Sequence, residues 1–324
     1  MRLKSIIAIA LIPQIFAVNW LQNNPSIIDK YYQYIYGYIL SINSFLYSNI
    51  SIPVGEILYI IIIIYFIYLI YKVFSLKLND SINLMAFISI IYFIFYSFWG
   101  LNYFKTSIFY ESKIKNDYEF VDLDNTLKLI ISLMNEELEL ISDFNNLNYF
   151  EITNTIDLNV KKSIIPDILL YQTVSGHFIP FTSESIINFK IPKIELPVVI
   201  FHEQAHRMGY ADETEASFRG FTKAVESKNA NIRYSGYFYA LLKLLNEVNK
   251  NHKEKIEDYT SILNERIISD INDNIEFWSK YYNNFFDKIT SYLYDIYLKS
   301  NKQENGILSY NQVSIYIIDY YKGN

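Results

Sequence analysis

The stretch LPVVIFHEQAHRMGYADETEASFRG, residues 196–220, decides how the C-terminal part of the chain folds. Its apolar start predicts a buried helix that begins near Pro197, because proline suits the first helical turn. Gly209 suits the end of that helix, because glycine favours a C-terminal cap. Asp212 is a residue type that caps helix N-termini, so a second helix should start directly after it. We therefore expect two consecutive helices joined by a short turn.

Two of the four histidines fall in the motif His202-Glu203-Gln204-Ala205-His206. Residues four apart share one face of a helix, so both imidazoles can aim at a single Zn²⁺ ion. Glu203 is next to the first histidine and can take a proton from a water molecule that the metal activates. The motif therefore predicts a zinc-dependent hydrolytic site, with His202 and His206 as ligands and Glu203 as the catalytic base.

A catalytic zinc site needs a third protein ligand and one open position. Three carboxylates follow the motif closely, and they are Asp212, Glu213 and Glu215. Asp212 would complete a metzincin-like spacing, but that class needs a later methionine turn and no methionine lies beyond Met208. Glu215 lies on a different helix face from Glu213. Glu213 shares its stripe with small residues that would let the two helices approach closely: Ala216, Ser217, Gly220 and Ala224. The pattern favours Glu213, with Glu215 and Asp212 as alternatives.

A hydrolase also needs a donor that stabilises negative charge in the transition state. His177, Arg233 and Tyr234 are candidates, although each also suits a structural role. The stretch Gly176–Lys190 has β-branched and aromatic residues without a helical stripe, which predicts one or two extended segments. A segment from Phe178 to Phe189 would suit an edge strand that pairs with a substrate backbone.

The first third of the chain is apolar and nearly uncharged. Three stretches are long enough to cross a membrane, at about residues 5–24, 53–76 and 82–104. A cleaved signal peptide is the alternative interpretation of the first stretch. Basic residues before the first span and between the second and third predict that these two places are cytoplasmic: Arg2, Lys4, Lys72 and Lys77. We therefore expect residues 1–104 to form a transmembrane region, and residues 105–324 to form a domain outside the cytoplasm in the cell membrane.

Composition excludes several other classes of protein. Hydrophobic residues make up 51% of the 324 residues, which excludes an intrinsically disordered chain. The formal net charge of −6 argues against a nucleic-acid partner. The absence of cysteine excludes disulfides, thiolate metal sites and a cysteine nucleophile. Beyond the spans, apolar periodicity predicts mainly helices, including an amphipathic one over Phe277–Tyr297.

The chain resembles the bacterial family called domain of unknown function 3810, over most of its length. The residues that carry this resemblance are Trp99–Tyr103, Gly176–Thr182, Leu196-Pro197, His202–Gly209, Glu213–Ala216, Arg233–Tyr237, Tyr297–Asn301, Gly306-Ile307 and Ser309-Tyr310. The resemblance implies N-terminal spans and a domain of the HExxH type. The segment Glu213–Ala216 is also similar to the third-ligand helix of gluzincin peptidases, which implies Glu213 as the ligand. Where the family usually has Asn after that alanine, this chain has Ser217.

Together these features predict a mainly α protein, with three N-terminal transmembrane helices before a mostly helical, zincin-like metallopeptidase domain that contains a small β element. The expected function is zinc-dependent hydrolysis of a peptide or protein substrate at a lipid bilayer. The alternative is an inactive membrane receptor or scaffold whose zinc is structural. The sequence leaves the substrate and the oligomeric state open.

Overall fold

The structure is a computed structural model that describes residues 2–74, 77–106, 118–141, 160–303, 306 and 312–322. In these residues the chain is mainly helical and has one small sheet, which confirms the predicted mainly α class. Ile307, Ser309 and Tyr310, which contribute to the family resemblance, lie outside the described residues.

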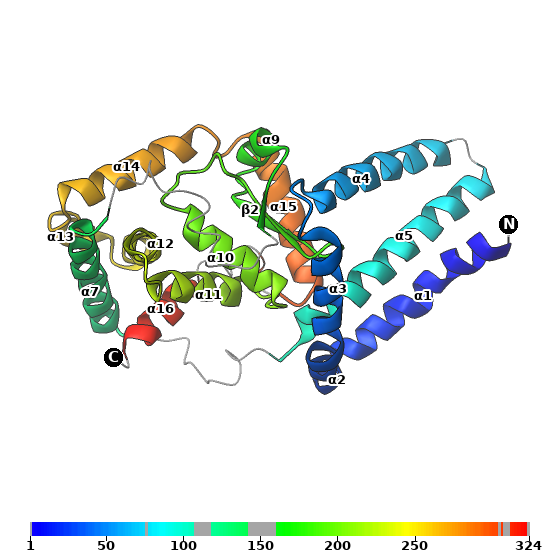
Figure 1. The fold of residues 1–324 in the computed structure, drawn as a ribbon, viewed down its shortest axis with the longest axis horizontal. Coiled ribbons are helices and arrows are strands. Elements are labelled where there is room, and N and C mark those ends of the chain that lie inside the picture. The colour runs from blue at the N-terminus through cyan, green and yellow to red at the C-terminus, as the bar shows by residue number, and fades with distance from the viewer. Residues whose placement is uncertain are drawn as a thin grey trace.

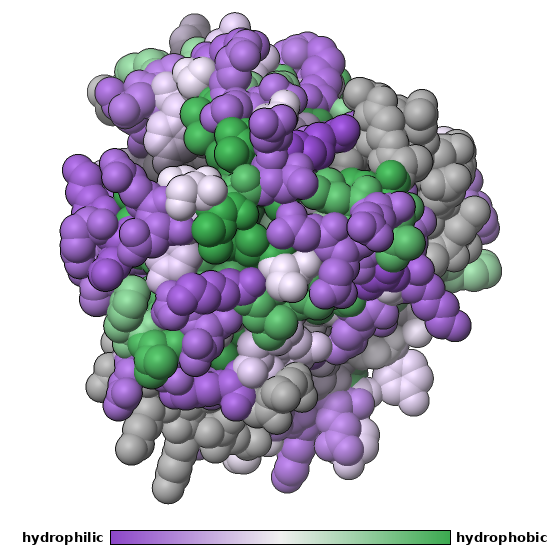
Figure 2. All heavy atoms as spheres, turned by 90° about the vertical axis from the view of Figure 1, so that its left-hand side faces the viewer, coloured by the Kyte–Doolittle hydropathy of each residue, from purple (hydrophilic) through white to green (hydrophobic). Residues whose placement is uncertain are grey.

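Three helices at the places of the predicted spans are long and apolar enough to cross a membrane, which indicates association with a membrane. They are α1 (Arg2–Gln22), α4 (Val54–Val73) and α5 (Leu78–Phe98). They extend together from one end of the molecule, with the start of α1, the end of α4 and the start of α5 at their far end (Figure 1). The opposite end of the molecule shows mainly hydrophilic side chains around smaller apolar patches (Figure 2).

Between the spans and the rest of the chain lies a set of short helices. These are α2 (Pro25–Tyr31), the π-helix η1 (Tyr32–Tyr36), α3 (Gly37–Tyr47) and the 3-10 helix η2 (Gly100–Phe104). The third span therefore ends at Phe98, earlier than the sequence predicts, because the aromatic residues after it pack on protein. They belong to a buried group that we call the membrane-proximal cluster: Val18, Ile28, Tyr36, Trp99, Tyr103, Phe104 and Ala211.

The main core lies on the other side of this cluster. Its helices are α7 (Phe120–Leu138), α10 (Leu196–Arg207), α11 (Glu213–Val225), α12 (Ala230–Asn251) and α16 (Val313–Lys322). Their apolar faces meet in one buried group that includes Ile130, Ile200, Phe221 and Leu241. α10 is thus held in the interior of the domain, as its apolar sequence predicts.

A three-stranded sheet packs beside α10. Its order is β1 (Val160–Lys162), β3 (Glu184–Ile187), β2 (Gly176–Ile179), with β1 parallel and β2 antiparallel to β3. The two extended segments expected in Gly176–Lys190 are therefore present. Because β3 is paired on both sides, only β2 keeps the edge position that we predicted for part of Phe178–Phe189.

Four further helices complete the described part of the domain: α9 (Pro166–Tyr171), α13 (Ile256–Thr260), α14 (Glu265–Ser279) and α15 (Phe285–Ser300), with a short 3-10 turn η4 (Lys253–Lys255). The single helix predicted over Phe277–Tyr297 is wrong. α14 ends at Ser279 and α15 begins at Phe285. In the turn between them Asn283 has a φ of 64°, and the Asn284 side chain accepts hydrogen bonds from two backbone N–H groups to cap α15.

Candidate metal centre

α10 carries both histidines of the motif on one face. Pro197 lies in its first turn, and Gly209 follows its last turn with a φ of +85°, so both predicted helix signals are confirmed. The N–H of Gly209 donates to the carbonyl of His206, and that of Tyr210 donates to the carbonyl of Ala205. These two bonds form a Schellman motif, which turns the chain sharply toward α11.

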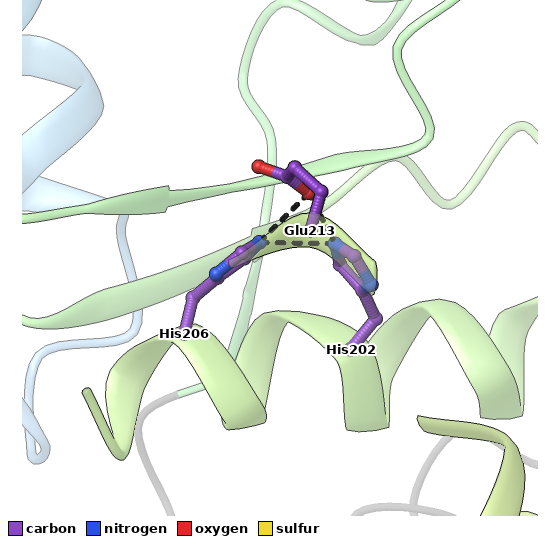
Figure 3. Close-up of side chains that lie close together, drawn as sticks. All are labelled: His202, His206 and Glu213. Atoms are coloured by element: carbon purple, nitrogen blue, oxygen red, sulfur yellow. Dashed lines mark hydrogen bonds and ion pairs between the residues drawn. The ribbon is translucent and has the colours of Figure 1, made fainter. Parts of the chain in front are cut away.

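α11 brings Glu213 over the two imidazoles (Figure 3). Its Oε2 atom lies 3.3 Å from His202 Nε2 and 3.3 Å from His206 Nε2, and the two Nε2 atoms are 3.0 Å apart. Gly220 permits this approach, because a Cβ built there would lie 3.0 Å from the Val198 carbonyl oxygen. The small-residue stripe therefore lies against α10, as the sequence predicts.

The spacing of these three atoms fits a tetrahedral zinc site. Bonds of about 2.0–2.1 Å to zinc place two ligands of a tetrahedron about 3.3–3.4 Å apart. The observed separations of 3.0 to 3.3 Å match this edge closely. Two imidazoles and one carboxylate are also a ligand set that catalytic zinc sites use. The residues present therefore fit the ion.

Neighbouring groups orient each of the three side chains. His206 Nδ1 lies 2.8 Å from the Tyr210 carbonyl oxygen. Because a carbonyl oxygen can only accept a hydrogen bond, Nδ1 carries the hydrogen, and the lone pair of Nε2 is left to bind a metal ion. His202 Nδ1 lies 3.2 Å from Ser217 Oγ. Ser217 thus contacts a proposed ligand.

The third contact comes from a residue that the sequence did not single out. Tyr294 on α15 donates its hydroxyl hydrogen to Glu213 Oε1 at 2.5 Å. This leaves Glu213 Oε2 for the imidazoles. The hydrogen bond joins residues 81 positions apart in a chain with 31 tyrosines, so no local pattern marks it.

The electrostatics of His202, His206 and Glu213 favour one proton, and thus one positive charge, held between the two imidazoles beside the carboxylate. Burial lowers the pKa of His202. Burial also opposes the charged form of His206, but the Glu213 carboxylate outweighs it and raises the pKa of His206 to about 9. Although burial disfavours its charge, Glu213 has a pKa well below the usual range because of the two histidines. A cation bound between the three atoms would take the place of the shared proton.

Glu203 lies beside the same group and is buried. Its Oε2 atom has no hydrogen-bond partner among the described residues, and burial raises its pKa to about 8. Its backbone carbonyl accepts a hydrogen bond from Ser185 on β3. Gly176 on β2 passes so close that a Cβ there would lie 3.0 Å from Glu203 Cγ. The edge strand and the expected catalytic base are therefore neighbours.

The two alternative third ligands have other partners. Glu215 pairs with Arg219 at 2.9 Å, one turn along α11. Asp212 caps α11, because its Oδ1 accepts the N–H of Glu215 at 2.8 Å. Among the described residues, the structure groups only Glu213 with the two histidines as a set of potential metal ligands.

The three candidate transition-state donors contact residues outside this group. His177 Nε2 lies 3.8 Å from Glu56 Oε1 at the start of α4. Arg233 forms two hydrogen bonds with the carboxylate of Glu137. Tyr234 donates to Asp270 at 2.8 Å.

Residues close to the candidate spans donate hydrogen bonds to the C-terminal end of α10 and the turn after it. Side chains from η1, from the residue after α5 and from the segment after η2 donate to four successive backbone carbonyls, 206–209. Trp99 donates to His206 at 3.0 Å, Tyr36 to Arg207 at 2.6 Å, Tyr32 to Met208 at 2.9 Å, and Lys105 to Gly209 at 3.0 Å. The helix that carries the histidines is therefore anchored by residues that lie before and just after the predicted domain boundary.

Among protein families, the model of the family described as "Protein of unknown function (DUF3810)" matches residues 31–318, which covers most of the chain. No curated protein and no solved structure matches.

Proposed function

The chain belongs to the DUF3810 family, whose description gives no activity, and we propose from the site alone that it is a membrane-anchored zinc metallopeptidase. One observation carries the proposal. Three donor atoms of the HExxH and Glu-bearing helices lie 3.0 to 3.3 Å apart, at the spacing of zinc ligands, with a buried glutamate beside them.

In this proposal His202, His206 and Glu213 hold the ion. When bound, Zn²⁺ would polarise a peptide carbonyl and lower the pKa of a water molecule to about 7. Glu203 would accept a proton from the attacking water as the water oxygen bonds to the carbonyl carbon, and would pass that proton to the amine nitrogen as the C–N bond breaks. A pKa near the working pH suits a group that first accepts and then donates a proton, and burial moves Glu203 in that direction.

The edge strand β2 supports a peptide as the substrate. Asn188 donates to the Ser175 carbonyl beside β2, so by antiparallel alternation the backbone groups of Gly176 and Phe178 point away from β3. A substrate strand added there would lie beside Glu203. Phe178→Pro removes one outward N–H, so we expect it to raise KM while zinc content stays unchanged.

The alternative function is a scaffold or receptor with structural zinc. A structural zinc site is closed by four protein ligands, whereas a catalytic site has three and an open position. The described residues group only three potential ligands here, which favours the catalytic proposal.

We also propose that the metal centre lies outside the cytoplasm. The basic residues at the far end of the spans support this orientation, because cytoplasmic ends carry an excess of Lys and Arg. A tag fused after Asn324 should then be cleaved by external protease in intact cells. Protection of the tag would reverse the orientation.

The decisive experiment uses the full chain in detergent micelles. We expect equimolar zinc in the wild type and in Glu203→Gln, and cleavage of a mixed peptide library by the wild type alone. Glu213→Gln should lose zinc, while the matched variant Glu215→Gln should keep it. Zinc binding without any cleavage that depends on Glu203 would favour the scaffold instead.

A further inference from the structure

Helices η1 and α3 leave a continuous apolar face uncovered. One side of them packs on the domain through contacts such as that of Tyr36 with Arg207. The opposite side exposes large apolar side chains at helical spacing, with Phe45 at 82% and Tyr38 at 74% exposure: Tyr34, Ile35, Tyr38, Ile42, Phe45 and Leu46. No charged residue occurs between Lys30 and Glu56. A face of this composition is unusual for a helix in water.

α15 repeats the same arrangement. Its inner side holds Tyr294 against Glu213 and buries Leu298. Its outer side is apolar and exposed over three turns, with Phe285 at 71% and Tyr292 at 67% exposure: Phe285, Phe286, Ile289, Tyr292, Leu293 and Ile296. The outer face therefore lies on the side of α15 opposite the metal centre.

Both helices lie where the spans enter the domain. α3 is joined to α4 by residues 48–53, and the end of α15 contacts the end of α5. Tyr96 donates to Asn301 at 3.0 Å, and the rings of Phe95 and Tyr297 are 6.2 Å apart. Figure 1 shows α3 and α15 running across the direction of the spans at this junction. The mainly hydrophilic end in Figure 2 lies at the other extreme of the molecule.

We propose that the outer faces of η1–α3 and α15 rest in the bilayer, at the boundary between headgroups and acyl chains. Three observations select lipid as the occupant. The faces continue from the spans, so a bilayer that surrounds α4 and α5 reaches them. They combine Tyr and Phe with aliphatic residues, the mixture that is enriched at membrane interfaces. On α15, the exposed Lys288 and Lys299 lie along one edge of the apolar face, where Lys299 pairs with Asp295 at 2.7 Å, and charged groups beside an apolar face are typical of helices that lie flat on a membrane.

This position of α15 determines how far the metal centre lies from the bilayer surface. A helix with its side chains is about 10–12 Å across. Since Tyr294 contacts Glu213 from the inner side of α15, the metal centre lies about one helix diameter from the bilayer surface.

The absence of cysteine in the chain permits a direct test. Single-cysteine variants of the full chain are labelled with a nitroxide spin label and placed in vesicles of phosphatidylcholine and phosphatidylglycerol. The rate at which each label collides with oxygen, which concentrates in lipid, is compared with its collision rate with a water-soluble nickel chelate. The two rates show whether the label lies in lipid or in water. The face variants are Phe45→Cys, Phe286→Cys and Leu293→Cys, and the matched control is Glu276→Cys on an exposed position of α14.

We expect the ratio of oxygen to nickel collisions to be several-fold higher at the three face positions than at Glu276. Nickel collisions at the face positions equal to those of the control would place the faces in water and overturn the proposal. Labels shielded from both reagents would show that protein covers the faces, and that result would overturn it too. The readout does not depend on zinc or on hydrolysis, so it is separate from the test of the proposed function.

Discussion

Enlarging Gly220 should separate the two helices that carry the metal ligands. A Cβ at this position would lie 3.0 Å from the Val198 carbonyl oxygen and 3.2 Å from the His202 backbone nitrogen. Both neighbours are backbone atoms of α10, so they cannot rotate away as a side chain would. α11 must therefore move away from α10, and it takes Glu213 with it.

The size of the shift follows from these contacts. Gly220→Ala needs a movement of a few tenths of an ångström, since van der Waals contacts of carbon lie at about 3.5 Å or more. Gly220→Val adds methyl groups that reach about 1.5 Å further. The distances of 3.3 Å between Glu213 and the imidazoles would then exceed 4 Å, too long for a shared tetrahedral ion. We expect zinc affinity to fall up to about tenfold for Ala and about 100-fold or more for Val, the range seen when ligand positioning is lost.

Competition with a chromophoric zinc chelator measures these affinities for the full chain in detergent. Gly37 provides the control, because a Cβ built there meets nothing within 4 Å. Gly37→Ala and Gly37→Val should leave zinc affinity unchanged. If Gly220→Val binds zinc as tightly as the wild type does, contact between α10 and α11 does not position Glu213, and the reasoning fails.

Three further variants test the supports of the site and the sheet. Tyr294→Phe should lower zinc affinity about 10- to 100-fold by freeing the ligand carboxylate, whereas Tyr292→Phe, on the exposed side of the same helix, should have no effect. Tyr36→Phe leaves a buried carbonyl of α10 without its donor and should cost about 1–3 kcal/mol of unfolding free energy, seen as a lower melting temperature. Glu184→Gln leaves the buried ammonium of Lys161 without its counter-charge and should cost about 3–5 kcal/mol, while adding Lys161→Met should restore part of the stability; no recovery in the double variant would contradict the buried ion pair.

The spans and the helical class were predictable because long uncharged runs and helical periodicity are local signals. The helices between the first two spans were not, since an uncharged stretch rich in Tyr and Ile has the same composition whether it contacts lipid or protein. Tyr36 shows this ambiguity, because it is 2% exposed and donates to Arg207, 171 residues away. The early end of the third span at Phe98 has the same cause, since aromatic side chains beyond it suit either environment.

The grouping of His202, His206 and Glu213 was predictable because the three residues lie within twelve positions, on two consecutive helices with recognisable caps. Helical spacing alone places the two imidazoles on one face, and the small-residue stripe identifies the face of α11 that approaches them. The surrounding groups were not predictable. Tyr294 and Trp99 reach the site from 81 and 107 residues away. Trp99 contributes to the family resemblance, but no spacing pattern around either residue links it to the histidines.

The metal centre contacts both the end of the last predicted span and α15, which carries one of the apolar faces that we propose rest in the bilayer. Trp99 directly follows the last span, and its ring lies 6.2 Å from that of His206. On the other side, α15 contacts Glu213 through Tyr294 and turns its apolar face outward. If both proposals hold, a peptide bound along β2 beside Glu203 passes about one helix diameter, 10–12 Å, from the bilayer. Peptide bonds next to a span or a lipid anchor are then within direct reach, whereas a compact protein in solution would have to extend a segment down to the membrane surface.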